Sequence, residues 1–254
     1  MGLILTHFNT SEYFLDADFR EFIFYNSTML FTDVQNLPGV FTSAPYDRSV
    51  NGSLWTLPWE IRMYIVLIGL GVALTIVNRF NNKIKFLEIS IVAIALISFL
   101  MFMDYHSHEE RHWFYYKFTK FLTAFFLGGS LFVFKKYIIL NKRLSLLIAF
   151  ILIISFMINE MVFFAVYMLL CPYLVLILAY LPKGFIRKYN QLGDISYGTY
   201  IYAWPIQQTL AISIIGISPY IMMIYAVPIT FVLATFSWLY IEKPMMNLKK
   251  KLVS

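Results

Sequence analysis

Seven long apolar runs, separated by short polar segments, divide this chain of 254 residues. The runs cover residues 60–78, 86–103, 116–134, 143–159, 161–181, 195–215 and 219–241. A bilayer core of about 30 Å requires roughly 20 mostly apolar residues in a helix, and the runs lack the alternation of half-buried strands. We therefore expect an all-α, polytopic membrane bundle of about seven spans. The fourth run is the weakest of them, because its apolar core covers only residues 144–158.

The basic residues predict how such a bundle is oriented. The segments that follow the first, third, fifth and seventh runs contain 14 Lys and Arg residues when Arg143, at the edge of the fourth run, is included. The alternate segments contain 4 when Lys117, near the edge of the third run, is included. Cytoplasmic loops collect Lys and Arg, so we expect the N-terminus outside and the C-terminus inside. This divides the chain into an extracytoplasmic segment with an interfacial helix (1–57), a seven-span bundle (58–244) and a basic cytoplasmic tail (245–254).

Composition excludes most soluble classes of protein. Hydrophobic residues make up 60% of the chain, charged residues only 13%, and the mean hydropathy is +0.70. A globular protein has about 25% charged residues. Membrane lipid is therefore the expected surrounding, and nucleic-acid binding and disorder are poor interpretations. The single cysteine, Cys171, rules out a disulfide framework and a cysteine-rich zinc site within this chain.

The segment before the first run is aromatic and polar, and we expect an interfacial helix there but no hydrophobic domain of its own. Trp55 and Trp59 suit the membrane interface, and Pro58 suits the first turn of a helix. Glu60 and Arg62 lie just inside the first run. Charged groups within a span usually face a polar cavity, so Glu60 is a candidate for a functional role. The alternative is an aromatic collar at a helix end.

The sixth run is unusually polar for a span. One face of its predicted helix carries Tyr197, Ile201, Trp204 and Gln208. Tyr200 and Gln207 follow a neighbouring stripe, and Asp194 is a candidate N-cap. Buried Gln and Tyr side chains need partners in a bilayer, so we expect this helix to line the bundle interior or a wet cavity. The alternative is that these polar side chains only hold neighbouring helices together and take no part in a reaction.

Three motifs together resemble a known family. Residues 51–64 (NGSLWTLPWEIRMY), 193–208 (GDISYGTYIYAWPIQQ) and 242–244 (EKP) occur in the order and spacing of landmarks of the acyltransferase 3 family of membrane O-acyltransferases. The stretch LPGVF at 37–41 fits as well, and the resemblance extends along essentially the whole chain.

The resemblance implies a multi-pass protein of the cell (inner) membrane with about ten spans. Such a protein moves an acyl group, often acetyl, from cytoplasmic acyl-CoA to a hydroxyl of an extracytoplasmic glycan, with no bound cofactor or metal. The candidate substrate-pocket residues are Trp55, Glu60, Arg62, Tyr64, Tyr197, Tyr200, Trp204 and Gln208.

The general base is unassigned. The catalytic histidine and companion arginine of the family lie on its first span, which has no counterpart in this chain. His7, His106, His108 and His112 all lie outside the predicted spans. We therefore expect the chain alone to be inactive, with an odd number of further N-terminal spans or a partner subunit completing the site. The expected outer position of the N-terminus also favours further N-terminal spans, because nothing in this chain would carry residues 1–57 across the membrane. The alternative is a short tail that is translocated after the first span inserts.

Two other classes of function remain alternatives. Residues 108–112 (HEERH) match the H-E-x-x-H pattern of zinc proteases, but Glu110 and Arg111 suit a solvated turn and a third ligand is not evident. A transporter or flippase is suggested by Pro172, Pro205 and Pro228 within the last three runs, but the runs show no internal repeat.

Overall fold

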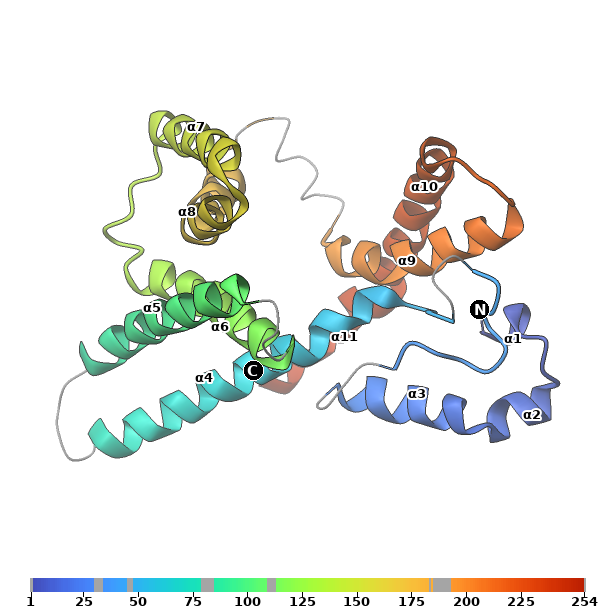
Figure 1. The fold of residues 1–254 in the computed structure, drawn as a ribbon. Helices are drawn as coiled ribbons and strands as arrows, with labels where there is room; N and C mark the ends of the chain where they lie inside the picture. Colours follow the sequence, from blue (N-terminus) through green and yellow to red (C-terminus); the bar gives the residue numbers. More distant parts are fainter. Residues whose placement is uncertain are drawn as a thin grey trace. The chain divides into compact units, whose positions relative to one another are not determined.

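The computed structural model describes residues 2–29, 34–44, 48–78, 85–108, 113–182, 184 and 193–253. Within these ranges every regular element is a helix (Figure 1). The helices are α1 (Gly2–Leu5), α2 (Thr10–Leu15), α3 (Ala17–Thr28), the 3-10 helix η1 (Gly52–Thr56), α4 (Leu57–Asn78), α5 (Lys85–Ser107), α6 (Trp113–Val133), α7 (Lys142–Ile158), α8 (Glu160–Tyr180), α9 (Ser196–Ser213), α10 (Pro219–Ser237), the π-helix η3 (Trp238–Glu242) and α11 (Lys243–Val253).

Each of the seven predicted apolar runs is a helix, from α4 to α10. By length and composition, four stretches of the described chain can cross a membrane: Gly52–Ile76, Phe86–Ser107, Glu160–Tyr180 and Pro219–Lys251. The other three helices depart from a simple span in different ways. Helix α7 has only 17 residues, α6 carries Lys117 and Lys120, and α9 carries the polar face described above. The count of seven spans and the orientation stay predictions.

The chain forms two compact units. One consists of Met1–Pro58 and Arg187–Ser254, and the other of Trp59–Ile186. The first unit therefore joins the beginning of the chain to α9, α10, η3 and α11. The second contains α5 to α8 and nearly all of α4.

The N-terminal part of the first unit contains a hydrophobic core that it shares with α9. Tyr13, Leu37, Val40, Phe41 and Val50 are buried together with Ala44, and Ile212 of α9 packs against them. Where we expected one interfacial helix, the structure has two helices, α2 and α3. They are separated at Asp16, whose backbone is extended and whose carboxylate accepts from the N–H of Asp18.

Helices α9 and α10 lie side by side in the first unit (Figure 1). Their close approach follows from small side chains: a Cβ added at Gly198 would lie 2.8 Å from the Cα of Ala234. Ala226, Thr230, Ala234 and Ser237 are the buried residues of α10. Such spacing of small residues lets the backbones of two membrane helices come into contact.

The second unit is built from two helical pairs, α5 with α6 and α7 with α8 (Figure 1). Ile91, Ala95 and Phe126 form the core between α5 and α6, against which Val66 and Leu70 of α4 pack. Asn159 alone joins α7 to α8, and its side-chain oxygen accepts from the N–H of Val162.

We expect Gly198→Ala to destabilise the first unit by about 1–3 kcal/mol, because the new methyl group meets backbone that cannot move aside as a flexible side chain would. The matched control is Gly71→Ala on α4, where a Cβ meets nothing within 4 Å. Removing that glycine should be neutral or stabilise the helix by up to about 1 kcal/mol. Unfolding of both variants in mixed micelles, followed by circular dichroism, measures the difference, and equal stabilities would contradict it.

Candidate functional site

The candidate site is the contact between residues 49–56 and helix α9. Pro205 lies inside α9 and has no N–H to donate to the carbonyl of Ile201, four residues earlier. The side-chain amide of Asn51 donates to that carbonyl instead, with an Nδ2–O distance of 2.9 Å. The oxygen of the same amide accepts from the N–H of Ser53 and starts η1. Asn51 thus joins the two segments.

The backbone carbonyl of Ser49 makes a second set of contacts with α9. It accepts from the indole Nε1 of Trp204 at 3.3 Å and from Nε2 of Gln208 at 3.0 Å. Gln208 is only 4% exposed, so this bond satisfies a buried amide. The position of Ser49 is held from the other side by Gln35, whose Oε1 accepts from the Ser49 hydroxyl and whose carbonyl accepts from the N–H of Val50.

Tyr200 connects α9 to the other end of η1. Its hydroxyl donates to the carbonyl of Ser53 and is also hydrogen-bonded to the hydroxyl of Thr56. A phenol has one proton, so Thr56 is the donor in the second bond. Three side chains of the polar part of α9, Tyr200, Trp204 and Gln208, therefore bind the same short segment.

Two glycines make room for aromatic rings in this unit. A Cβ at Gly52 would lie 2.6 Å from Cζ2 of Trp204. A Cβ at Gly193 would overlap the indole of Trp238, and the positive φ of +94° at Gly193 also favours glycine. After Gly193, α9 begins at Ser196, whose N–H and hydroxyl donate to Asp194. The residue directly before the helix is Ile195, so the predicted cap at Asp194 is one position away.

The chemistry of this contact is that of hydroxyl, amide and indole groups. Such groups suit a ligand that is rich in hydroxyls and has apolar ring faces, because they offer hydrogen bonds beside aromatic surface. Tyr197 and Gln207 are exposed on α9, and Trp55 is half-buried in η1. None of the side chains that form the contact is a carboxylate or an imidazole, so the contact supplies no general base.

The other predicted pocket residues lie on α4, in the second unit. The guanidinium of Arg62 lies over the ring of Trp59, 4.4 Å from its centroid, and 5.6 Å from that of Phe114. Glu60 is exposed, and residues two positions apart on a helix point in different directions, so Glu60 and Arg62 do not share a face. Tyr64 is 54% exposed and packs edge to face with Phe125.

The described histidines do not form a metal site. Within the described ranges, no group of three His, Cys, Asp or Glu residues is placed to hold a metal ion. His106 lies among Phe102, Tyr116 and Phe164, whereas His108 is exposed beyond α5 and its Nδ1 hydrogen-bonds to the carbonyl of Asp104. Residues 109–112 of the H-E-x-x-H match lie outside the described residues.

The sequence predicted the bounds of the polar helix, with the run 195–215 against α9 at Ser196–Ser213. It did not predict which groups bind this helix. Ser49, Asn51 and Thr56 supply the partners of α9, and Gly52 supplies the space for Trp204. A signal for one of these contacts was present. A proline inside a helix frees the carbonyl four residues before it, here that of Ile201, and this carbonyl requires a donor from elsewhere.

Known proteins offer no match to this chain among family models, curated sequences or solved structures. The resemblance of the three motifs therefore stays a prediction. What the structure adds is the contact between two of them.

The role of Asn51 predicts a coupling with Pro205. Asn51→Ala should lower the free energy of unfolding by about 1–3 kcal/mol, because the Ile201 carbonyl loses its donor. In a Pro205→Ala background the backbone N–H of residue 205 becomes available to that carbonyl, so the same substitution should cost less. A double-mutant cycle on unfolding in mixed micelles measures this difference and cancels the lost bond to Ser53. Strictly additive effects would contradict the assignment.

Proposed function

We propose that this chain is the acceptor-lining part of a membrane O-acyltransferase that acts on an extracytoplasmic glycan. One observation carries the proposal: the motifs at 51–64 and 193–208 are in direct contact, through the bond between Asn51 and Ile201 across 150 residues. These are two of the stretches on which the resemblance to the acyltransferase 3 family rests. Their association in space is what a shared binding surface requires.

The residues suit a sugar acceptor. Trp55, Tyr197 and Trp204 offer aromatic surface, on which the apolar face of a sugar ring packs. Gln207 offers an exposed amide for the ring hydroxyls, and the hydroxyl oxygen of Thr56, whose proton goes to Tyr200, can accept from them. Glu60, Arg62 and Tyr64 follow directly in the first motif, and we propose that they also take part in acceptor binding.

The proposed reaction needs a group that this contact does not contain. Acyl transfer from acyl-CoA begins when a base removes the proton of the acceptor hydroxyl. The hydroxyl oxygen then attacks the thioester carbonyl, and the thiolate of CoA leaves with the bonding electrons. We propose that the base is a histidine that lies outside this contact.

We also propose that all seven helices from α4 to α10 cross the inner membrane, with the N-terminus outside. The alternation of basic segments supports this count, and so does the match of each predicted run to one helix. Helix α9 is polar for a span because its polar side chains bind residues 49–56.

Accessibility of single cysteines tests this topology. In a Cys171→Ala background, we expect Ile215→Cys to react with an impermeant maleimide in intact cells, and Tyr137→Cys and Lys249→Cys to react only after permeabilisation. Tyr137 and Ile215 are both exposed, so burial does not limit their labelling. If only the four most apolar helices crossed and the N-terminus lay outside, all three cysteines would reverse their behaviour. If the same four crossed with the N-terminus inside, the three would label as for seven spans, so Ser11→Cys, which is exposed on α2, must also react in intact cells.

The proposed activity is tested in the native cell. Deletion of the coding region should remove O-acetyl ester from a surface glycan, measured by nuclear magnetic resonance of the isolated polymer, and the intact gene should restore it. Restoration with Glu60→Gln should lower the ester content about tenfold or more, because a hydrogen bond to a charged group contributes roughly 1.5–3 kcal/mol.

The control for this substitution is Glu88→Gln, which removes the same charge from the first turn of α5. We expect it to leave the ester content unchanged. Full activity of the Glu60 variant would remove Glu60 from the site, and an unchanged glycan in the deletion strain would refute the proposed function itself.

A further inference from the structure

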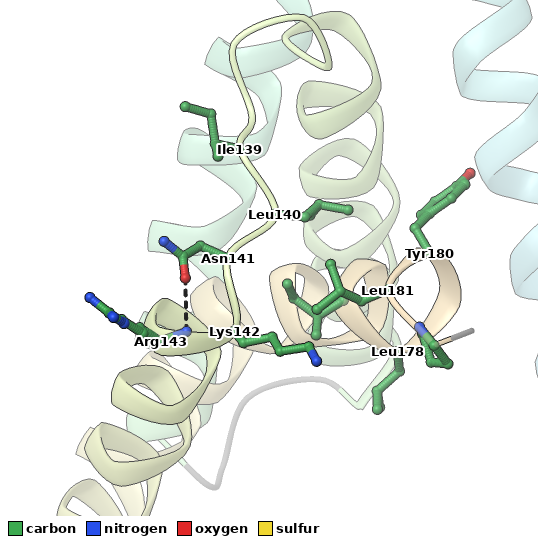
Figure 2. Close-up of a pocket in the computed structure, with 10 residues that line it drawn as sticks. Ile139, Leu140, Asn141, Lys142, Arg143, Leu178, Tyr180 and Leu181 are labelled. Carbon is green, nitrogen blue, oxygen red and sulfur yellow. Dashed lines mark hydrogen bonds between the residues drawn. The ribbon is translucent and has the colours of Figure 1, made fainter. Parts of the chain in front are cut away.

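Two adjoining cavities lie in the second unit, where α6, α7 and α8 meet the connector 134–141. The first has a volume of about 990 Å³ and lies between the connector, the start of α7 and the end of α8 (Figure 2). The second has a volume of about 750 Å³ and lies between the end of α6, the connector and α8. Leu140 and Tyr180 line both, so the cavities share a wall.

The connector that forms this wall is held in place by one side chain. The hydroxyl of Tyr173 on α8 donates to the carbonyl of Ile139 at 2.8 Å and accepts from the N–H of Asn141 at 3.1 Å. Asn141 in turn caps α7, with its side-chain oxygen accepting from the N–H of Arg143 (Figure 2). A phenol that satisfies two backbone groups fixes the position of Leu140 between them. The wall between the two cavities is therefore formed by a connector of defined structure.

The lining combines apolar walls with cations. Leu178 of α8 and Leu181, directly after this helix, face the first cavity, and the side chain of Lys142 extends toward them (Figure 2). Arg143 points to the other side of the helix start (Figure 2). Lys135 lines the second cavity. Among the described residues that line either cavity there is no carboxylate, so the lining carries net positive charge.

Such a lining complements one kind of molecule. Apolar walls favour hydrocarbon, and exposed Lys and Arg side chains beside them favour an anionic group attached to it. Basic pockets between membrane helices on the cytoplasmic side bind the headgroups of anionic lipids. A zwitterionic lipid offers the same hydrocarbon but a headgroup without net charge, so it gains less from these cations.

We propose that the paired cavities bind one anionic phospholipid, with its acyl chains along the two apolar cavities on either side of Leu140 and its phosphate at Lys142. This goes beyond the proposed acyl transfer and does not depend on it. The lipid would fill the space between α6, α7 and α8 and hold the short helix α7 against its neighbours.

Native mass spectrometry of the full chain tests this binding with two probes, dioleoyl phosphatidylglycerol and dioleoyl phosphatidylcholine, which have identical chains. We expect one phosphatidylglycerol to remain bound to each wild-type chain, at least about tenfold more tightly than phosphatidylcholine. In Lys142→Gln this preference should disappear. The variant Lys142→Arg keeps the charge and should retain the preference, and so should Arg143→Gln, because the Arg143 side chain points to the other side of the helix start.

A second control is Lys249→Gln, which removes the same charge from α11 in the other unit. It should keep the preference, and an equal loss there would show non-specific attraction and overturn the proposal. Leu140→Trp, which fills the shared wall, should weaken binding of both lipids, with circular dichroism confirming that the variant is folded. Equal binding of both lipids to the wild type, or displacement of phosphatidylglycerol by acetyl-CoA at similar concentration, would also overturn it.

Discussion

The first unit depends on the pairing of one backbone carbonyl. Pro205 makes α9 unable to satisfy the carbonyl of Ile201, and an unpaired carbonyl in apolar surroundings is unfavourable by several kcal/mol. Asn51 supplies the donor and thereby holds residues 49–56 along the helix. Once this segment is in place, the carbonyl of Ser49 is within reach of Trp204 and Gln208, and the hydroxyl of Tyr200 reaches Ser53 and Thr56. The polar groups of α9 are thus satisfied by one neighbouring segment.

The second unit solves a related problem with a different side chain. The connector before α7 leaves the carbonyl of Ile139 and the N–H of Asn141 without helical partners, and the hydroxyl of Tyr173 pairs with both. Backbone groups that no helix pairs need partners from side chains or water wherever they are buried. In both units a polar side chain satisfies backbone that no helix pairs. The candidate acceptor site lies beside one of these positions and the proposed lipid site beside the other.

These two places differ in the chemistry that they offer. Residues 49–56 and α9 present uncharged donors and acceptors beside aromatic rings, which suits a polyol such as a glycan. The connector and the start of α7 present cations beside aliphatic walls, which suits an anionic lipid. Neither contains a carboxylate or an imidazole among its described lining residues, so neither supplies a group that would deprotonate its proposed ligand. The proposed acyl transfer therefore relies on a base from outside these two places.

The sequence by itself determined the helices, because apolar length is a local property. The run predicted at 161–181 is α8, Glu160–Tyr180, and the run at 143–159 is α7, Lys142–Ile158. In the structure the run ending at 241 continues as helix to Val253. The sequence did not predict this extension, because α11 is amphipathic and lacks the hydrophobic signal of a span. The polar face of α9 was equally visible, from Tyr197 to Gln208.

Only the tertiary structure decided what those helices contact. The buried cluster around Tyr13 and Val50, the bond of Asn51 to Ile201 and the anchoring of the connector by Tyr173 all join residues far apart in the chain. Helical periodicity shows which residues share a face, but it carries no information about the partner of that face. The partner is selected by close packing and by the pairing of backbone groups, and both exist only when the chain is folded.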